Sequence, residues 1–147
     1  MATITNTSIG KVTTTVTVTN RIDQILVERG FIPATQIRSV TLDNVLVDTG
    51  ATRLCLPENI INDLGLPLQG EVDVKIAVGV QKVRIFRELS ISVAGREGTF
   101  NCIELPAGND ALLGLIPLED LGLEPDLQNQ CLRVLPLSGK NTYLSVL

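Results

Sequence analysis

One aspartate in this chain is placed where a carboxylate could do chemistry. Asp48 follows the aliphatic run Val-Leu-Val and precedes a threonine and a glycine, in the stretch NVLVDTGATRLCLP at residues 44–57. The run is typical of a buried strand, and Gly50 allows the chain to turn tightly after it. A carboxylate held at such a turn can act as a general acid or base on a water molecule. Asp, Thr and Gly are also common turn residues, so the tripeptide by itself favours an ordinary turn.

Residue types that are missing narrow the possible chemistry. The chain has no histidine, which excludes nucleophiles activated by an imidazole. Its three cysteines, Cys55, Cys102 and Cys131, are odd in number and far apart, so we expect reduced, core or half-buried thiols and no disulfide framework. Without histidine or a CxxC pair we expect no metal site, and no motif indicates a cofactor. Any catalysis therefore falls to carboxylates, lysine, tyrosine or an unassisted thiol.

Length and composition are those of one ordinary globular domain. With 147 residues, 44% hydrophobic and only 3% aromatic, the chain predicts a single domain over residues 1–147 with a core of Val, Ile and Leu. The net charge is −4 and the twelve Lys and Arg are scattered, so we expect no nucleic-acid partner. No apolar run approaches the ~20 residues that span a bilayer, and the first residues contain no hydrophobic segment of signal type, so we expect no membrane partner and a cytoplasmic location.

The elements that must position Asp48 are mostly strands. Alternation of apolar and polar residues with period two predicts half-buried strands at residues 11–20, 71–78 and 89–93. After the last of these, AGREGTF predicts a hairpin in which Gly95 and Gly98 adopt positive φ. Short helices are predicted at residues 21–30 and 57–65 and from Pro117 to residue 122. We therefore expect an all-β fold with a few short helices, closer to a rolled or closed barrel than to a layered α/β fold.

A second motif lies far along the chain, where Ala111, Leu112 and Leu113 run into Gly114 and then a short helix. In order, an aliphatic strand ending in Asp-Thr-Gly-Ala, a hairpin and this apolar-apolar-Gly motif resemble the retropepsin-like aspartic peptidases. The likeness includes the retroviral proteases and is closest to small bacterial proteins of the same fold. It spans about residues 10–136, and it implies an aspartic endopeptidase that hydrolyses polypeptides.

Peptide hydrolysis of this kind needs two carboxylates around one water, one ionised as general base and one protonated as general acid. The chain has a single Asp-Thr-Gly. Other aspartates lack this context and better fit solvated or capping roles: Asp43, Asp63, Asp73, Asp110, Asp120 and Asp126. The resemblance therefore implies a homodimer with two-fold symmetry, in which each copy contributes one Asp48.

The resemblance also implies roles for individual residues. Asp48 is the expected catalytic carboxylate, Thr49 is expected to hydrogen-bond across the dimer axis, and the amide of Gly50 is expected to approach the carboxylate. The hairpin KIAVGVQKV is the expected flap. Residues implied to bind substrate are Ala51, the flap tip Val78, Gly79 and Val80, and Leu113 and Gly114 of the second motif.

Several features depart from the retroviral pattern. The flap contains only one glycine, Gly79, and Leu115 stands where retroviral proteases carry an arginine that ties the dimer together. Arg53 could replace that arginine, although a solvated role is more typical of its position. We expect terminal strands from CLRVLP or NTYLSVL at the interface, because unpaired apolar edges aggregate. Residues 21–40 form a probable helical insertion without an assigned role.

A second hypothesis comes from a different class. The glycine-poor flap also suits a non-catalytic, dimeric β-barrel module that retains the retropepsin fold to bind peptides or to act as a scaffold. Cleavage of peptides that depends on Asp48 distinguishes the two.

Overall fold

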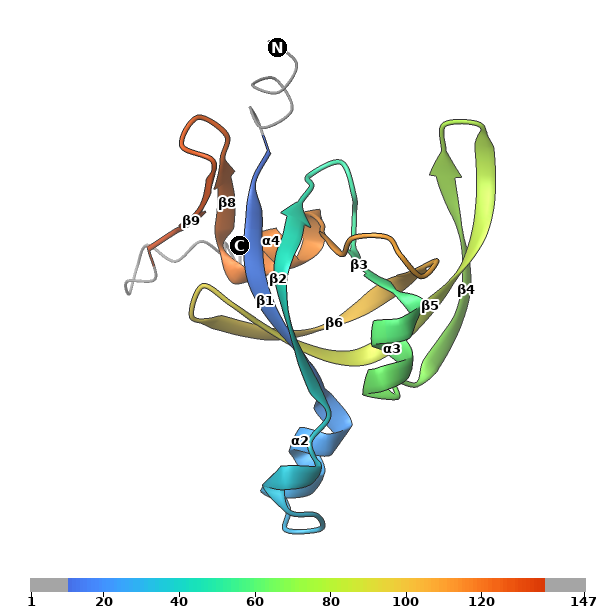
Figure 1. The fold of residues 1–147 in the computed structure, drawn as a ribbon, viewed down its shortest axis with the longest axis vertical. Coiled ribbons are helices and arrows are strands. Elements are labelled where there is room, and N and C mark those ends of the chain that lie inside the picture. Colours follow the sequence, from blue (N-terminus) through green and yellow to red (C-terminus); the bar gives the residue numbers. More distant parts are fainter. Residues whose placement is uncertain (1–10, 137–147) are drawn as a thin grey trace, which may run out of the picture.

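The computed structural model describes residues 11–136, and strands predominate in them (Figure 1). The strands are β1 (Thr13–Asn20), β2 (Ser39–Val47), β3 (Leu54–Pro57), β4 (Leu68–Ile76), β5 (Gly79–Val93), β6 (Arg96–Leu105), β7 (Leu112–Leu113), β8 (Leu123–Asp126) and β9 (Cys131–Val134). The helices are α2 (Arg21–Glu28), α3 (Glu58–Leu64), α4 (Leu115–Leu121) and the 3-10 helix η1 (Ala34–Gln36). The expectation of a mostly β fold with a few short helices is confirmed.

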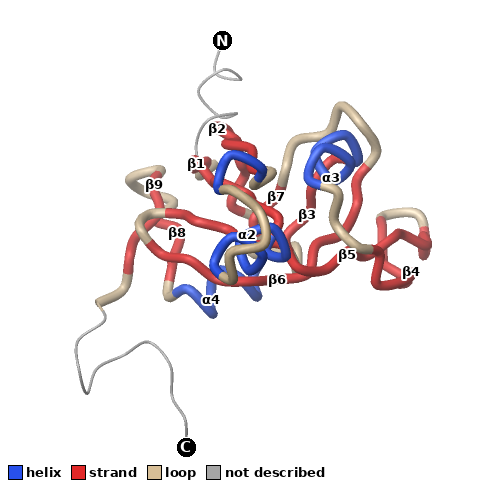
Figure 2. Tube along the Cα trace, turned by 90° about the horizontal axis from the view of Figure 1, so that it is seen from below, coloured by secondary structure: helices blue, strands red, loops and turns tan. Residues whose placement is uncertain are grey.

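Seven of these strands form one sheet that curls into a ring. Its order is β1-β2-β7-β3-β6-β5-β4, and β1 also pairs with β5. The pairs β2–β7 and β3–β6 are parallel, and the others are antiparallel. The two-residue strand β7 thus lies between β2 and β3, which are consecutive in sequence. The β4–β5 hairpin and the separate β8–β9 hairpin lie on opposite sides of the molecule (Figures 1 and 2).

Aliphatic side chains build the core, as the composition predicts. In β1, Val16 and Val18 are fully buried while Thr13 and Thr15 are exposed, which confirms the period-two pattern. Each fully buried aliphatic side chain contributes about 1.5–3 kcal/mol through removal from water. The largest core side chains come from the five elements β3, α3, β5, β7 and α4: Leu54, Leu56, Ile61, Leu64, Leu89, Ile91, Leu113 and Leu118. No helix within residues 11–136 is long and apolar enough to cross a membrane.

Two local expectations need correction. The β5–β6 turn consists of Ala94 and Gly95, with φ of 52° and 80°, and Gly98 does not adopt positive φ. Gly98 lies inside β6, where an added Cβ would come within 2.8 Å of the Phe100 ring. The predicted helix at Pro117 begins two residues earlier, as α4, because the first turn of a helix tolerates a residue without an N–H.

Helix α2 forms where the sequence predicts it, at the end of the molecule away from the flap tip (Figure 1). Asn20 caps its first turn by accepting from the Asp23 amide at 3.0 Å. Asp23 is the buried residue of this helix, whereas the apolar Ile22 and Ile25 are 40% and 37% exposed. The helix is therefore attached to the ring-shaped sheet through polar contacts.

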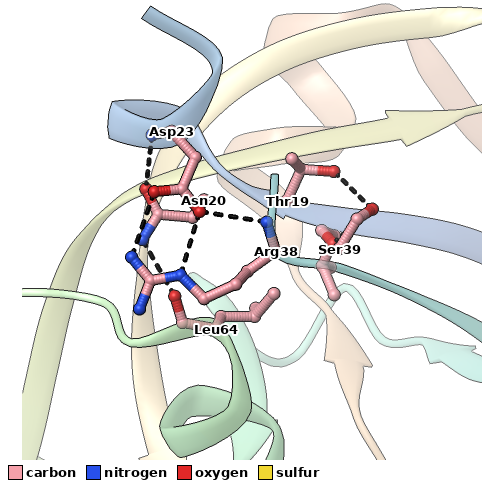
Figure 3. A network of polar contacts seen from close by, with 7 residues as sticks. Thr19, Asn20, Asp23, Arg38, Ser39 and Leu64 are labelled. Atoms are coloured by element: carbon pink, nitrogen blue, oxygen red, sulfur yellow. Dashed lines mark hydrogen bonds and ion pairs between the residues drawn. The ribbon is translucent and has the colours of Figure 1, made fainter. Parts of the chain in front are cut away.

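Those contacts form a network around one buried carboxylate (Figure 3). Asp23 accepts three hydrogen bonds from Arg38, through Nε at 2.9 Å, Nη2 at 3.0 Å and the backbone amide at 3.0 Å. The guanidinium holds the pKa of Asp23 below its usual range. Asn20 donates to the carbonyl of Leu64 at 2.8 Å, which links α2 to the end of α3. This network anchors the chain just before β2 begins.

Candidate active site

The loop after β2 holds Asp48 in a tight turn. The amide of Asp48 donates to the Leu113 carbonyl at 3.0 Å, which continues the β2–β7 pairing. The Gly50 amide donates to Oδ1 of Asp48 at 2.9 Å, and the Ala51 amide donates to its carbonyl at 3.1 Å. An added Cβ on Gly50 would lie 3.1 Å from that Oδ1, so a side chain there would press on the carboxylate. Asp48 is half-buried, and Thr49 and Gly50 are exposed.

The second motif packs directly against this loop. The amides of Leu115 and Ile116, at the start of α4, donate to the carbonyls of Ala51 and Thr52 at 2.8 and 2.9 Å. These bonds satisfy two of the N–H groups that the first turn of a helix leaves without partners. Leu113 and Gly114, predicted to bind substrate, therefore stand beside the Asp48 loop, although Leu113 is fully buried in the core.

Gly114 is required by this close approach. An added Cβ would lie 2.3 Å from the carbonyl oxygen of Arg53 and 2.7 Å from that of Ala51. Both contacts are with backbone, which cannot rotate away as a side chain can. The apolar-apolar-Gly pattern thus has a local physical cause. Arg53 itself is half-buried and forms no ion pair within the described residues.

Burial makes two of the cysteines, Cys55 and Cys102, poor nucleophiles. Burial raises the pKa of the Cys55 thiol to about 11, with a further contribution from the negative charge of Asp48. Burial likewise raises the pKa of Cys102 to about 12. Both are free and buried, as expected, whereas Cys131 is free but exposed at the start of β9, which corrects the expectation of a core or half-buried thiol. Within residues 11–136, no cluster of three or more Cys, Asp and Glu side chains is arranged to hold a metal ion.

The predicted flap is the β4–β5 hairpin. Ala77 and Val78 form its two-residue turn, and Gly79 follows with a φ of 130°. Val78 and Val80 are 90% and 64% exposed. Figure 1 shows the tip at the same end of the molecule as the Asp48 loop but apart from it, so the single chain does not bring these predicted substrate-binding residues against Asp48.

Two hollows open on the surface, one beside the Asp48 loop at Thr49 and one along β2, and neither is lined by Asp48. One, of about 370 Å³, is mainly apolar and lies between α4 and the β8–β9 hairpin; its walls include Thr49, Leu115, Leu118, Leu123, Pro125 and Leu135. The other, of about 430 Å³, lies between β2, α3 and the loop before β7, and its walls include Asp43, Asn59, Asn109 and Asp110. Asp48 thus stands on an open surface beside an apolar hollow.

An ion pair that the sequence does not reveal lies at the base of the flap. Arg84 of β5 and Glu104 of β6 form two hydrogen bonds, of 2.9 and 2.7 Å. Neither residue lies in a strand predicted from the alternation of residue types, and only the register between β5 and β6 places them opposite each other.

Comparison with known protein families was made on the sequence. A family model described as gag-polyprotein putative aspartyl protease matches residues 35–120, and no curated protein shows a significant match. The matched range contains the Asp48 loop, the flap hairpin and the Gly114 motif, and it begins after α2. The chain therefore belongs to the gag-polyprotein putative aspartyl protease family, as its two glycine-containing motifs predicted.

Proposed function

We propose that this protein is an aspartic endopeptidase whose active site consists of Asp48 from each of two copies. The observation that supports this most directly is the Asp48 carboxylate itself, fixed by the Gly50 amide in a loop that is hydrogen-bonded to the second motif. Within residues 11–136 the hydrogen bond to the Asp48 side chain is the one from Gly50 to Oδ1, which leaves Oδ2 for a water molecule. Family membership independently supports aspartyl protease chemistry.

The chemistry uses the two carboxylates in different protonation states. Two such groups at short range share one proton, because like charges ionise together only at high cost. The ionised Asp48 takes a proton from the water, whose oxygen attacks the peptide carbonyl carbon, while the protonated Asp48 donates to the carbonyl oxygen. Collapse of the tetrahedral intermediate breaks the C–N bond, and the amine leaves with a proton returned from a carboxyl group.

An apolar surface beside the loop supports the dimer. Leu115 and Ile116 are 38% and 39% exposed, and their amides are bonded to the loop, so two loops that approach each other also bring these side chains together. Burial of apolar area takes the place of the arginine of retroviral proteases. Thr49 lies at the edge of the hollow between α4 and the β8–β9 hairpin, which Leu115 also lines, and there its hydroxyl can reach the partner copy. The segment CLRVLP contains β9, which pairs with β8 in its own chain, and NTYLSVL lies outside the described residues.

The flap offers an apolar face to an extended peptide. Register places Val72 opposite Val83 on one face, with Val74 beside them, and all three are half-buried. The opposite face presents charged residues, among them Asp73 and Lys82, which form an ion pair with each other. A substrate strand with apolar side chains fits the uncharged face.

Mutation of the carboxylate tests the activity. Asp48→Asn should lower the rate of cleavage of a denatured-protein or peptide library by roughly 100-fold to 10,000-fold, because the general base is lost. Asp43→Asn is the matched control, since Asp43 is exposed on the same strand and should leave the rate unchanged. Equal cleavage by wild type and Asp48→Asn would overturn the proposal, and peptide binding without cleavage would favour the non-catalytic module.

Oligomeric state tests the dimer separately. Ile116→Glu should shift sedimentation-equilibrium mass toward the monomer and lower activity in proportion, because a charge would be buried at the interface. Ile25→Glu is the matched control, since Ile25 is equally exposed but lies on α2 at the other end of the molecule. A wild-type monomer with full activity would contradict shared Asp48 residues.

A further inference from the structure

The long strand β5 changes partners halfway along its length. From Ile85 to Val93 it pairs with β6, whereas from Gly79 to Arg84 it pairs only with β4. The outer half of the β4–β5 hairpin therefore projects from the ring as a two-stranded ribbon, as Figure 1 shows. A ribbon of two strands is only marginally stable by itself, so its orientation depends on what holds its base.

Both strands are irregular at that base. The register of β4 shifts between Leu68 and Gly70, and that of β5 shifts between Phe86 and Leu89. Leu68 pairs with Phe86, so the two irregularities lie side by side. Glu88, inside the β5 bulge, has a φ of 63°, which is uncommon for a residue with a side chain. Bulges bend and twist strands, so the hairpin changes direction here.

One ion pair connects the projecting ribbon to the ring at this level. Arg84 donates from Nε and Nη2 to the two carboxylate oxygens of Glu104, and its guanidinium lies 5.3 Å from the centre of the Phe86 ring. The Glu104 side chain is only 13% exposed, although that of Arg84 is 46% exposed. Hydrogen bonds to Glu104, together with the charges of Glu58 and Glu71, raise the pKa of Arg84. The planar, two-point geometry fixes direction as well as distance.

Glu104 is also close in the sheet to the catalytic loop. It pairs with Leu56 of β3, the strand that continues directly from that loop. Through Glu104, Arg84 thus ties the flap to β6. Strand β6 pairs with β3, and β3 follows the Asp48 loop.

We propose that Arg84 and Glu104 are positioning residues that latch the base of the flap and set its orientation over the peptide cleft. The expected effect on peptide cleavage rests on the proposed function. The expected effect on the motion of the hairpin does not. Loss of the latch frees the ribbon at its bulges without removing any residue that touches the reacting atoms. Substrate binding should weaken, while chemistry at Asp48 continues once the flap has closed.

The same hairpin supplies a matched control. Asp73 and Lys82 form an ion pair of 3.5 Å farther toward the tip, with both side chains more than 60% exposed. This pair joins β4 to β5 within the ribbon and makes no link to β6. Asp73→Asn therefore removes a flap charge without touching the base.

Hydrogen exchange measured by mass spectrometry tests the latch in the protein without substrate. Glu104→Gln and Arg84→Gln should each speed exchange in peptides covering residues 82–88 and 101–105 by roughly fivefold, as expected for loss of one two-point charged contact. Asp73→Asn should leave these peptides unchanged. Wild-type exchange rates in Glu104→Gln would overturn the latch.

Steady-state kinetics test the positioning role. In Glu104→Gln, KM should rise roughly fivefold with kcat within about twofold of wild type, which is the pattern of lost binding without lost chemistry. The exchanged pair Arg84→Glu with Glu104→Arg should restore both KM and exchange. Faster exchange with an unchanged KM would reduce the pair to a structural role and overturn the proposal. Faster exchange in a protein whose wild type cleaves no peptide would leave the latch standing and refute the proposed function instead.

Discussion

Asp23 and Asp48, which lie near opposite ends of β2, have contrasting surroundings. Near its start, Asp23 is 4% exposed and its oxygens receive three hydrogen bonds from Arg38. At its end, Asp48 is half-buried and, within the described residues, its side chain accepts one hydrogen bond, from Gly50. A carboxylate whose two oxygens both accept hydrogen bonds from the protein stabilises the fold and has no oxygen left for a water molecule. One with a free oxygen at an open surface can still bind water and exchange a proton.

The range matched by the family model separates the two aspartates in the same way as their surroundings do. The matched range begins at residue 35, so it includes Asp48 and leaves out Asp23 together with the rest of α2. The Asp23 network joins an element outside the matched range to the strand that leads into the Asp48 loop. We infer that it supports the position of β2 and takes no part in the chemistry.

Asp48→Asn is the change with the largest expected effect, and it separates activity from stability. Cleavage should fall by roughly 100-fold or more, while the free energy of unfolding should fall by no more than about 1 kcal/mol, because the half-buried side chain accepts one hydrogen bond, from Gly50. Urea titration beside the cleavage assay measures both. A large loss of stability in Asp48→Asn would mean that Asp48, like Asp23, mainly stabilises the fold, and the two aspartates would then not differ in role.

Gly114→Ala should be the most disruptive small change near the active site. A methyl group 2.3 Å from the Arg53 carbonyl forces the backbone apart, and such overpacking lowers the free energy of unfolding by about 3 kcal/mol. Gly98→Ala is the matched control, because its new methyl would meet side-chain atoms, of Phe100 at 2.8 Å and of Leu121 at 3.1 Å, which shift more easily than backbone, so it should be less destabilising. Thermal unfolding at one protein concentration compares them. Equal stability of the two variants would show that the backbone at Ala51 and Arg53 can move away from residue 114 at little cost in free energy.

Asp23→Asn should destabilise the fold without touching the active site. Loss of charged hydrogen bonds lowers the free energy of unfolding by about 2 kcal/mol, a value already reduced for the half-exposed Arg38 guanidinium. Because the folded-state pKa of Asp23 lies below its ordinary value of 3.8, its stabilisation is complete above that pH and is lost as pH falls through the folded-state pKa.

The difference in unfolding free energy between wild type and Asp23→Asn should therefore shrink as urea titrations move from pH 7 toward pH 3. Activity per mole of folded protein should be unchanged at pH 7. A difference that stayed constant over this range would mean that the Asp23 charge does not contribute.

Sequence patterns predicted the elements better than their contacts. Alternation predicted β1, β4 and the end of β5, because solvent and core face opposite sides of each strand. The hydrogen bonds from Leu115 and Ile116 that join the two glycine motifs are seen only in the structure. Asp23 escaped notice, since an acidic residue in the first turn of a helix normally complements the helix dipole at the surface. Its partner Arg38 lies beyond a loop and a 3-10 helix, and no local pattern links them.

Register explains why the Arg84–Glu104 pair could not be predicted either. Leu89 pairs with Phe100, and in a regular ladder Arg84 would then face Leu105. The bulge between Phe86 and Leu89 inserts one residue, which brings Glu104 opposite Arg84 instead. A bulge follows from the packing of both strands, so the sequence of one strand does not reveal it.

Arg38→Lys is the mildest change and separates charge from geometry at Asp23. Lysine keeps the positive charge but lacks the planar fork that meets both carboxylate oxygens, so we expect a loss of about 1 kcal/mol in the free energy of unfolding, half that of Asp23→Asn. The guanidinium also covers Gly65, where an added Cβ would lie 2.0 Å from Nη1, and a lysine would leave that surface open. Urea titration of Arg38→Lys, Asp23→Asn and the double variant measures the coupling between the two residues. If Arg38→Lys proves as destabilising as Asp23→Asn, two-point geometry rather than charge secures the start of β2. If it matches wild type, charge alone suffices, and the contrast with Asp48 rests on burial.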